Sequence, residues 1–365
     1  MKKVKFTEVF EDVTKYGRKI QTDGYLEEGK YPIIDQGQNE IAGYTNEEIG
    51  LFSNIPVIVF GDHTRIIKFV DTPFFLGADG VKVLKPIISN VDYKYLYYSL
   101  LNVKIPDTGY NRHFKWLKES EILLPSLEEQ KAIAERLDKV SGLIEKRKAQ
   151  LEKLDLLIKS RFIEMFGDVI TNSKSWKQYI FSEIATSRLG KMLDAKQQTG
   201  ESSFPYLANF NVQWFGFDLT SLNQMDFDEE DRVEFELKEG DLLVCEGGEI
   251  GRCAVWHNEM QPCYFQKALH RVRCNAELIN PNYMAWWFKY NCDHNGFAAI
   301  EGAKATIAHL PGAKLKLLRV TTPPIELQNE FAAFIEQVDK SKFEIQKSLE
   351  KLETLKKALM QKYFG

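Results

Sequence analysis

The chain has 365 residues, of which 44% are hydrophobic and 27% are charged. This length allows two or three globular domains, and the composition excludes a disordered or fibrous protein. Because 48 basic and 52 acidic residues leave a net charge of −4, any nucleic-acid-binding surface must be local. The first residues (MKKVKFTEVFEDVTKYG) lack a signal-peptide apolar run, and no window approaches the roughly 20 apolar residues of a membrane span. We therefore expect a cytoplasmic protein without a membrane segment.

The first block of the sequence, 1–124, has the pattern of a mixed domain. An apolar, β-branched run at 57–61 ends in glycine, and residues 80–84 alternate in the manner of a half-buried strand. A helix is expected around 93–101. Together these segments predict an α+β domain with much β structure.

Residues 125–167 follow as one long predicted helix. Ser126 and Glu129 have the spacing of a capping box, and Gly167 suits the position just past the last turn. About 40 residues at 1.5 Å each give a helix of roughly 60 Å, which is far longer than the globular average. Such a helix needs a partner.

The second half of the chain repeats this plan. The segment 323–365 aligns without a gap on 125–167 at an offset of 198, and the block 168–322 shares weaker similarity with 1–124. In the two blocks, F-T-E-V at 6–9 matches F-S-E-I at 181–184. A duplication explains these matches better than helical composition does. We therefore predict four parts: domains at 1–124 and 168–322, each followed by a long helix, at 125–167 and 323–365.

Apolar residues in both helices recur in alternating steps of four and three, which is a heptad seam. The seam positions are Ile133, Leu137, Val140, Ile144, Leu151, Leu154 and Ile158 in the first helix and Phe331, Ile335, Val338, Ile345, Leu349, Leu352 and Leu359 in the second. Because some seam positions are polar in one copy and apolar in the other, pairing of the two different helices within one chain is favoured. Homodimerisation, or packing of each helix on its own domain, stays open.

Motifs for catalysis or metal binding are mostly absent from the sequence. There is no P-loop pattern, and the six histidines lack the spacing of a zinc site. The five cysteines never form C-x-x-C, which is typical of reduced thiols. Residues 280–283 (N-P-N-Y) are similar to the N-P-P-Y motif of adenine methyltransferases, but Asn280 as a helix cap with Pro281 in the first turn is the better account. We expect no cofactor and no metal in this chain.

Two kinds of loop are candidates for contacts with DNA. The first kind interleaves cationic, amide and aromatic side chains, which suits phosphates, base edges and stacking. The second kind is rich in amides, which can contact adenine bidentately. The candidates of the first kind are Tyr110, Asn111, Arg112, His113 and Lys115, with Lys304, Thr306 and His309 at the corresponding place in the second half; those of the second kind are Gln36, Gln38, Asn39, Lys196, Gln197, Gln198, Asn209 and Asn211. An ordinary surface loop is the alternative for each.

The whole chain resembles the specificity subunit of type I restriction-modification systems. The resemblance is carried by L-P-S-L-E-E-Q at 124–130, by the helix tails ending in F-G, and by the alternation of domain and long helix. The second helix departs from it, because Leu327 replaces a glutamate and Pro324 replaces the capping serine. The resemblance implies two target recognition domains, each reading one half of a bipartite DNA site, and an antiparallel intramolecular coiled coil that sets the spacer between the halves.

The same resemblance implies the partners. They would be double-stranded DNA and two methyltransferase subunits, and it stays open whether restriction or translocase subunits join them. S-adenosylmethionine, ATP and magnesium would then belong to the partner subunits, and this chain would be a non-catalytic recognition subunit. Because the two domains differ in sequence, the two half-sites should also differ.

Two other functions remain as alternatives. One is a coiled-coil scaffold whose two domains bind proteins or peptides. The other is a self-sufficient methyltransferase that uses residues 280–283. Methyl transfer to duplex DNA, measured with and without partners, would separate the three.

Overall fold

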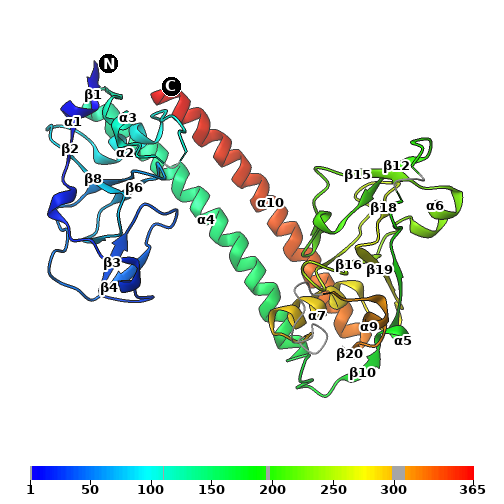
Figure 1. Ribbon diagram of the computed structural model, residues 1–365. Helices are drawn as coiled ribbons and strands as arrows, with labels where there is room; N and C mark the ends of the chain where they lie inside the picture. Colours follow the sequence, from blue (N-terminus) through cyan, green and yellow to red (C-terminus); the bar gives the residue numbers. More distant parts are fainter. Residues whose placement is uncertain (1, 110, 195–197, 298–308) are drawn as a thin grey trace. The chain divides into compact units, whose positions relative to one another are not determined.

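A computed structural model describes residues 2–109, 111–194, 198–297 and 309–365. The chain folds as two compact units: Met1–Gln150 together with Ile345–Gly365, and Leu151–Glu344. We call these unit 1 and unit 2. Each unit contains one α+β domain (domain 1 before residue 125, domain 2 between 168 and 322) and part of two long helices, α4 (Leu127–Phe166) and α10 (Ile325–Phe364) (Figure 1).

Domain 1 is built from three small sheets and short helices, and its smallest sheet is the antiparallel pair β1–β9. Its four-stranded sheet has the order β2-β8-β5-β6, and its three-stranded sheet has the order β4-β3-β7, in which β3 and β7 are parallel. The strands are β1 (Lys2–Lys5), β2 (Phe10–Asp12), β3 (Tyr31–Ile34), β4 (Gly43–Thr45), β5 (Val57–Gly61), β6 (Ile67–Val70), β7 (Phe75–Leu76), β8 (Val81–Pro86) and β9 (Glu121–Leu124). The helices are α1 (Phe6–Val9), α2 (Tyr93–Leu101) and α3 (Phe114–Lys118), with 3-10 turns η1 (Thr14–Tyr16) and η2 (Thr22–Gly24).

Domain 2 repeats this topology. Its sheets have the orders β11-β19-β16-β17 and β15-β12-β18, again with a parallel pair, β12 and β18. The strands are β10 (Lys177–Ile180), β11 (Ala185–Leu189), β12 (Ser203–Leu207), β13 (Val212–Gln213), β14 (Gly216–Phe217), β15 (Asn223–Asp226), β16 (Leu242–Cys245), β17 (Cys253–Val255), β18 (Tyr264–Phe265), β19 (Leu269–Cys274) and β20 (Arg319–Thr322). The helical segments are α5 (Phe181–Ile184), η4 (Asn209–Asn211), α6 (Glu229–Phe235), α7 (Pro281–Asp293) and α9 (Gly312–Lys316). The duplication predicted from the sequence is therefore confirmed in three dimensions.

Equivalent contacts show how closely the two domains correspond. The buried hydroxyl of Tyr95 in α2 donates to the Leu123 carbonyl at 2.7 Å, and the hydroxyl of Tyr283 in α7 donates to the Thr321 carbonyl at 2.6 Å. Burial raises the pKa of Tyr95 to about 12, because the charged phenolate would lose its hydration. Tyr95 and Tyr283 thus mark the same position in α2 and α7.

The hairpin β13–β14 has no counterpart between β3 and β4 of domain 1. In domain 1 those strands are joined by residues 35–42, all of which are described and form no strand. In domain 2 the corresponding connection, residues 208–222, includes the hairpin with Trp214 and Phe215 at its tip. This insertion makes the two domains chemically different.

The long helices begin and end as the sequence predicts. At the start of α4 the Ser126 N–H donates to the Glu129 carboxylate at 3.0 Å, and the Glu129 N–H donates to the Ser126 Oγ at 3.3 Å, which is the expected capping box. At its end Gly167 has φ +73°, a conformation that favours glycine. Asn280 likewise caps α7, accepting from the Asn282 N–H at 2.8 Å.

Helices α4 and α10 pair antiparallel in both units. In unit 1 the Arg136 guanidinium donates to the Tyr363 hydroxyl at 2.9 Å, and the Lys148 ammonium lies 3.5 Å from the Glu353 carboxylate. In unit 2, Arg161 contacts Glu330 at 3.0 Å and Lys342 contacts Asp155 at 2.7 Å. Of the predicted seam positions nine are buried, and Leu151, Leu154, Ile345, Leu352 and Leu359 are half-buried. Pairing is within one chain, so homodimerisation is not needed to cover the seam.

A buried glutamine joins each long helix to its own domain. Gln130 accepts from the Asp92 N–H at 2.9 Å and donates to the Pro125 carbonyl at 3.0 Å. Gln328, which is fully buried, accepts from the Asn280 N–H at 2.9 Å and donates to the Pro323 carbonyl at 2.7 Å. These two glutamines are identical positions of the repeat, and each holds the start of a long helix against the start of a domain helix.

None of the helices among the described residues is both long enough and apolar enough to cross a membrane.

Candidate nucleic-acid interface

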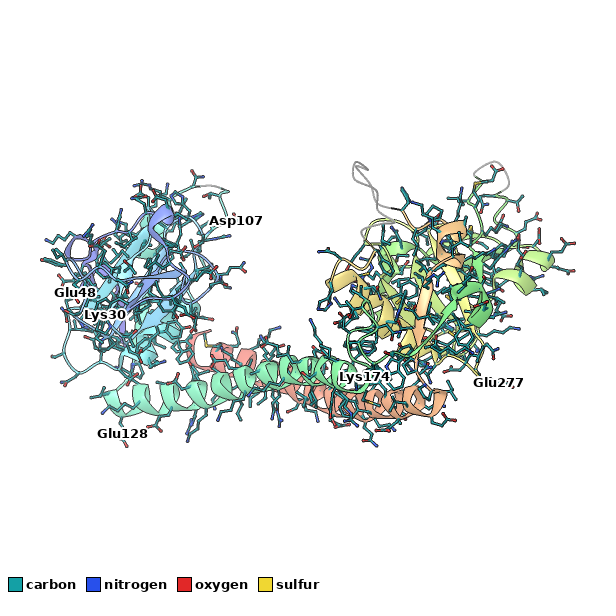
Figure 2. All side chains as sticks on the ribbon, turned by 90° about the horizontal axis from the view of Figure 1, so that it is seen from below. Lys30, Glu48, Asp107, Glu128, Lys174 and Glu277 are labelled. Carbon is teal, nitrogen blue, oxygen red and sulfur yellow. The ribbon has the colours of Figure 1, made fainter. Side chains whose placement is uncertain are left out.

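Loops from distant parts of domain 1 meet at one end of its four-stranded sheet. We call residues 35–37, 62–66, 77–80, 107–109 and 111–113 the loop end of domain 1. Gln36 connects three of these loops, because its side-chain carbonyl accepts from the His63 N–H at 3.1 Å and its amide donates to the Asp79 carbonyl at 3.0 Å. Figure 2 shows Asp107, in this loop end, on the side of the domain away from α4. The loop end is therefore a solvent-facing surface with a fixed backbone.

Asp62 and His113 fasten the last of these loops to the tip of the β5–β6 hairpin. Asp62 is only 3% exposed, and its carboxylate accepts from the Phe114 N–H at 2.8 Å. Its carbonyl accepts from the His113 N–H at 2.7 Å and from the His113 Nδ1 at 3.0 Å. The side chains that follow, beginning with α3, are positioned by these bonds.

The charges at this loop end are partly balanced. Lys19 contacts Asp79 at 2.6 Å, and this bond lowers the pKa of Asp79, with Arg112 contributing. The Gly109 N–H and the Arg65 guanidinium, 3.0 Å away, lower the pKa of Asp107. Exposed Arg112 therefore belongs to a mixed-charge surface, in keeping with the nearly neutral composition.

Domain 2 has the same arrangement with different side chains. Its loop end comprises residues 190–194, 208–211, 246–252, 266–268 and 309. The Arg252 guanidinium donates to the Asn209 carbonyl at 2.9 Å, and the Leu310 N–H donates to the Glu246 carbonyl at 2.7 Å. His309 pairs with Gly247 in an isolated β-bridge. Loops that correspond by topology thus meet at corresponding ends of both domains.

The structure brings several of the predicted contact residues to these loop ends. Arg112 is exposed at the loop end of domain 1, and Lys115 follows on α3 with its ammonium 4.1 Å from the Trp116 ring centre. Asn111 is also exposed there, and its amide donates to the Thr108 carbonyl at 2.6 Å. His309 is exposed and Asn209 is half-exposed at the loop end of domain 2. Tyr110, Lys196, Gln197, Lys304 and Thr306 lie outside the described residues.

Other predicted contact residues have structural roles. His113 and Asn211 are each 1% exposed, and the Asn211 amide donates to the carbonyls of Asp218 and Ser221 at 2.9 Å. Gln198 lies between the Asp194 carbonyl and the Asp226 N–H. Because their polar groups already bond within the domain, we leave these residues and Gln36 out of the interface.

Gln38 and Asn39 are exposed but lie on another face. Gln38 lines a cavity together with Tyr97 of α2 and Asp138 of α4, and the Asn39 carbonyl accepts from the Lys68 ammonium at 2.5 Å. They are also left out of the interface.

Sequence reasoning missed three cations at the loop ends. Arg65 has φ +63° in the β5–β6 turn, and Arg252 lies at the end of the corresponding turn in domain 2. Lys191 forms an ion pair with Asp231 and donates to the Asp226 carbonyl at 2.8 Å. The sequence could have indicated Arg65 and Arg252 as contact candidates, because each follows a buried strand and a turn. Nothing in the sequence distinguished Lys191.

No group of three or more His, Cys, Asp or Glu side chains that could hold a metal ion is found among the described residues. The five cysteines, all of which lie in the described part of the chain, form no disulfide, and burial raises the pKa of Cys263 and of Cys274 to about 12. This is typical of unreactive, structural cysteines.

The sequence matches a known family over most of its length. Residues 1–153 and 173–357 match the family model described as the type I restriction modification DNA specificity domain. Each match contains one of the two domains with part of the long helix that follows it.

Curated relatives of this chain carry related descriptions. A putative type I restriction enzyme MjaX specificity subunit from Methanocaldococcus jannaschii is 26% identical over 47% of this chain and 41% of its own length. The EcoR124I/EcoR124II specificity subunit of Escherichia coli is 29% identical over 39% of this chain and 38% of its own. The EcoKI specificity subunit of Escherichia coli K12 is 21% identical over 67% of this chain and 56% of its own length. The aligned parts thus span about 38 to 56% of these relatives' lengths.

Solved structures share the fold. The type I restriction-modification S subunit from M. genitalium superimposes with a TM-score of 0.64 at 18% identity, covering 100% of this chain and 96% of that one. A chain from a study of complex assembly and conformational transition of the type I R-M system superimposes with a TM-score of 0.55 at 16% identity. The superposition covers 100% of this chain and 97% of that one.

Proposed function

Because this chain belongs to the type I restriction-modification DNA specificity family, we propose that it selects the DNA sequence for a type I restriction-modification complex. In this proposal the loop end of each domain reads one half of a bipartite site. The observation that carries the proposal is the duplicated loop end: one topology presents corresponding loops twice, with different side chains. Two different readers select two different half-sites, so the target is asymmetric.

We propose that the paired helices set the unspecified spacer between the half-sites. Each helix is 40 residues long, which corresponds to about 60 Å of helix. Two linked readers gain affinity through effective concentration only when the span between them matches the separation of their targets.

The helices also offer duplicated positions for partner subunits. Leu157 and Leu355 are equivalent in the repeat, and both are about half exposed, 46% and 45%. Exposed apolar side chains at equivalent positions suit two copies of one partner. These partners would be methyltransferase subunits, which would supply S-adenosylmethionine chemistry, while ATP and magnesium would belong to restriction or translocase subunits.

The present chain then acts as a non-catalytic reader in the cytoplasm, where its DNA substrate lies. Neither a P-loop pattern nor a complete N-P-P-Y motif occurs in the sequence, and Asn280 is occupied as a helix cap. The alternative of a coiled-coil scaffold with protein-binding domains finds no support in the family match.

The proposed function predicts that sequence-specific methyl transfer requires both this chain and its methyltransferase subunits. Transfer of a labelled methyl group to duplex DNA is measured with this chain alone, with its methyltransferase subunits alone, and with both together. Sequence-specific transfer is expected only in the third mixture, because recognition and chemistry are on different chains. Methylation by this chain alone, or equal specificity without it, would refute the assignment.

A further inference from the structure

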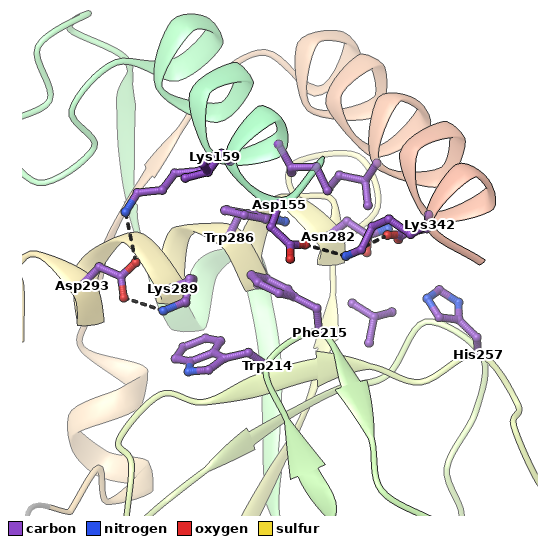
Figure 3. A pocket seen from close by; sticks show the side chains of 16 residues that line it. Asp155, Lys159, Trp214, Phe215, His257, Asn282, Trp286, Lys289, Asp293 and Lys342 are labelled. Carbon is purple, nitrogen blue, oxygen red and sulfur yellow. Dashed lines mark hydrogen bonds and ion pairs between the residues drawn. The ribbon is translucent and has the colours of Figure 1, made fainter. Parts of the chain in front are cut away.

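A cavity in unit 2 has features that reading DNA does not explain. It measures about 600 Å³ and lies between α4, α10, α7 and the tip of the β13–β14 hairpin. Trp214 and Phe215 from the hairpin and Trp286 from α7 form its centre, as Figure 3 shows. We call this cavity the aromatic pocket. It is built partly by the insertion that domain 1 lacks.

Phe215 is held in the pocket at a conformational cost. Its φ of +63° is in the left-handed region, which is unfavourable for a residue other than glycine. Its ring stacks on Trp286 with centroids 4.5 Å apart and an interplanar angle of 16°. Residues in strained backbone conformations are often found at functional sites. The conformation of Phe215 therefore suggests that the aromatic pocket has a role in binding.

Charges at the two ends of the pocket are opposite in sign. At one end the Lys342 ammonium lies 2.7 Å from Asp155 and 3.8 Å from Asp339, so two carboxylates share one cation. At the other end Asp293 lies between Lys159, at 3.6 Å, and Lys289, at 2.5 Å. Figure 3 shows the two groups on either side of Phe215.

The acidic end is not fully compensated. Burial raises the pKa of Asp339 and the neighbouring Asp155 raises it further, and the opposing effects of Lys342 and His257 do not cancel this rise. His257, which also faces this end, is paired with Glu239 at 3.0 Å. A second cation placed here would stabilise both carboxylates.

In unit 1 the chain supplies such a cation itself. The Lys94 ammonium in α2 lies 4.1 Å from the Phe69 ring centre and 3.9 Å from Asp138, beside a cavity of about 520 Å³. Tyr95 and Tyr283 occupy the same position in α2 and α7, so the residues directly before them, Lys94 and Asn282, also correspond. Asn282 is neutral and lines the aromatic pocket. In unit 2 this position therefore adds no positive charge to that of Lys342 at the acidic end.

We propose that the aromatic pocket binds an arginine side chain of a partner polypeptide. A guanidinium can stack on the face of Phe215 while its five N–H donors reach two carboxylates, which a compact ammonium does less well. The Trp214 ring already has the Lys289 ammonium 4.9 Å from its centre. The exposed apolar surface of the pocket favours a polypeptide over a free small molecule, because Leu156 is 63% exposed and Phe215 is 41% exposed. Exposed apolar groups beside a charged anchor are typical of protein interfaces. This site is present in one half of the chain.

A short peptide and its neutral isostere test the proposal. Binding of N-acetyl-Leu-Arg-Leu-amide to the full chain is measured by calorimetry and compared with the same peptide carrying citrulline, which keeps the shape and loses the charge. We expect the arginine peptide to bind at least tenfold more tightly. The double variant D155N/D339N should lose that advantage, whereas D23N/D71N, which removes two exposed carboxylates of domain 1, should keep it.

The variant Phe215→Gly separates binding from folding. Glycine relieves the positive φ, so the thermal stability should stay near that of the wild type while arginine binding falls at least tenfold. The proposal is overturned by equal affinity for the two peptides, by unchanged binding in D155N/D339N or Phe215→Gly, or by absence of binding at millimolar peptide. None of these outcomes bears on whether the loop ends read DNA.

Discussion

Replacement of Gln328 by leucine is expected to reduce the free energy of unfolding of unit 2 by about 3 kcal/mol or more. The side chain is fully buried, and besides the Asn280 N–H and the Pro323 carbonyl it bonds the Leu278 carbonyl at 3.0 Å. Leucine has a similar volume but leaves three backbone groups without a partner, each at a cost of about 1–3 kcal/mol. Urea or thermal denaturation of the purified chain measures the loss.

Two further variants control this result. Gln346→Leu changes an exposed glutamine of the same helix and should stay within about 0.5 kcal/mol of the wild type. Gln130→Leu removes the two equivalent bonds of unit 1 and should cost about 2 kcal/mol. If Gln328→Leu is as stable as Gln346→Leu, the buried glutamine does not hold the helix to its domain.

The double variant R112A/K115A is expected to impair recognition of one half-site and to leave assembly with partner subunits intact. Both side chains are exposed, at or next to the loop end of domain 1. A contact to a base edge contributes about 1–3 kcal/mol, or roughly 5- to 150-fold in affinity. Selection of bound or methylated sequences from a library with both half-sites randomised measures the effect.

Lys30→Ala is the matched control, since Lys30 precedes β3 whereas the loop end follows it. This variant should keep the preference for both half-sites. An unchanged preference in R112A/K115A would remove the loop from the interface, and an equal loss at both half-sites would mean that these cations hold DNA without reading it.

The sequence was sufficient to predict the architecture because its signals are local or repeated. The Ser126–Glu129 capping box and the heptad steps each act within a few residues. The ungapped offset of 198 then relates one half of the chain to the other. Pairing of the two different helices was favoured because some seam positions are polar in one copy and apolar in the other, as Lys342 is against Ile144. In the structure Lys342 contacts Asp155 on the opposite helix.

The candidate site was harder to predict because loop amides serve two purposes. Gln36, Gln198 and Asn211 belong to residue types that can contact bases, yet here they tie loops together. Whether such an amide contacts a base or ties loops together depends on the residues around it in the fold, which the sequence does not show. The β13–β14 hairpin was missed for another reason: its strands have two residues each, and Trp214–Phe215 at the tip is not a typical turn sequence.

Mapping of methylated adenines in DNA from cells that produce this chain with its methyltransferase subunits tests the central proposal most directly. We expect one bipartite motif with two different halves and a constant spacer, and loss of one half in cells that produce R112A/K115A. A continuous or palindromic motif, or the same motif in cells without this chain, would contradict the account of two different readers joined by paired helices.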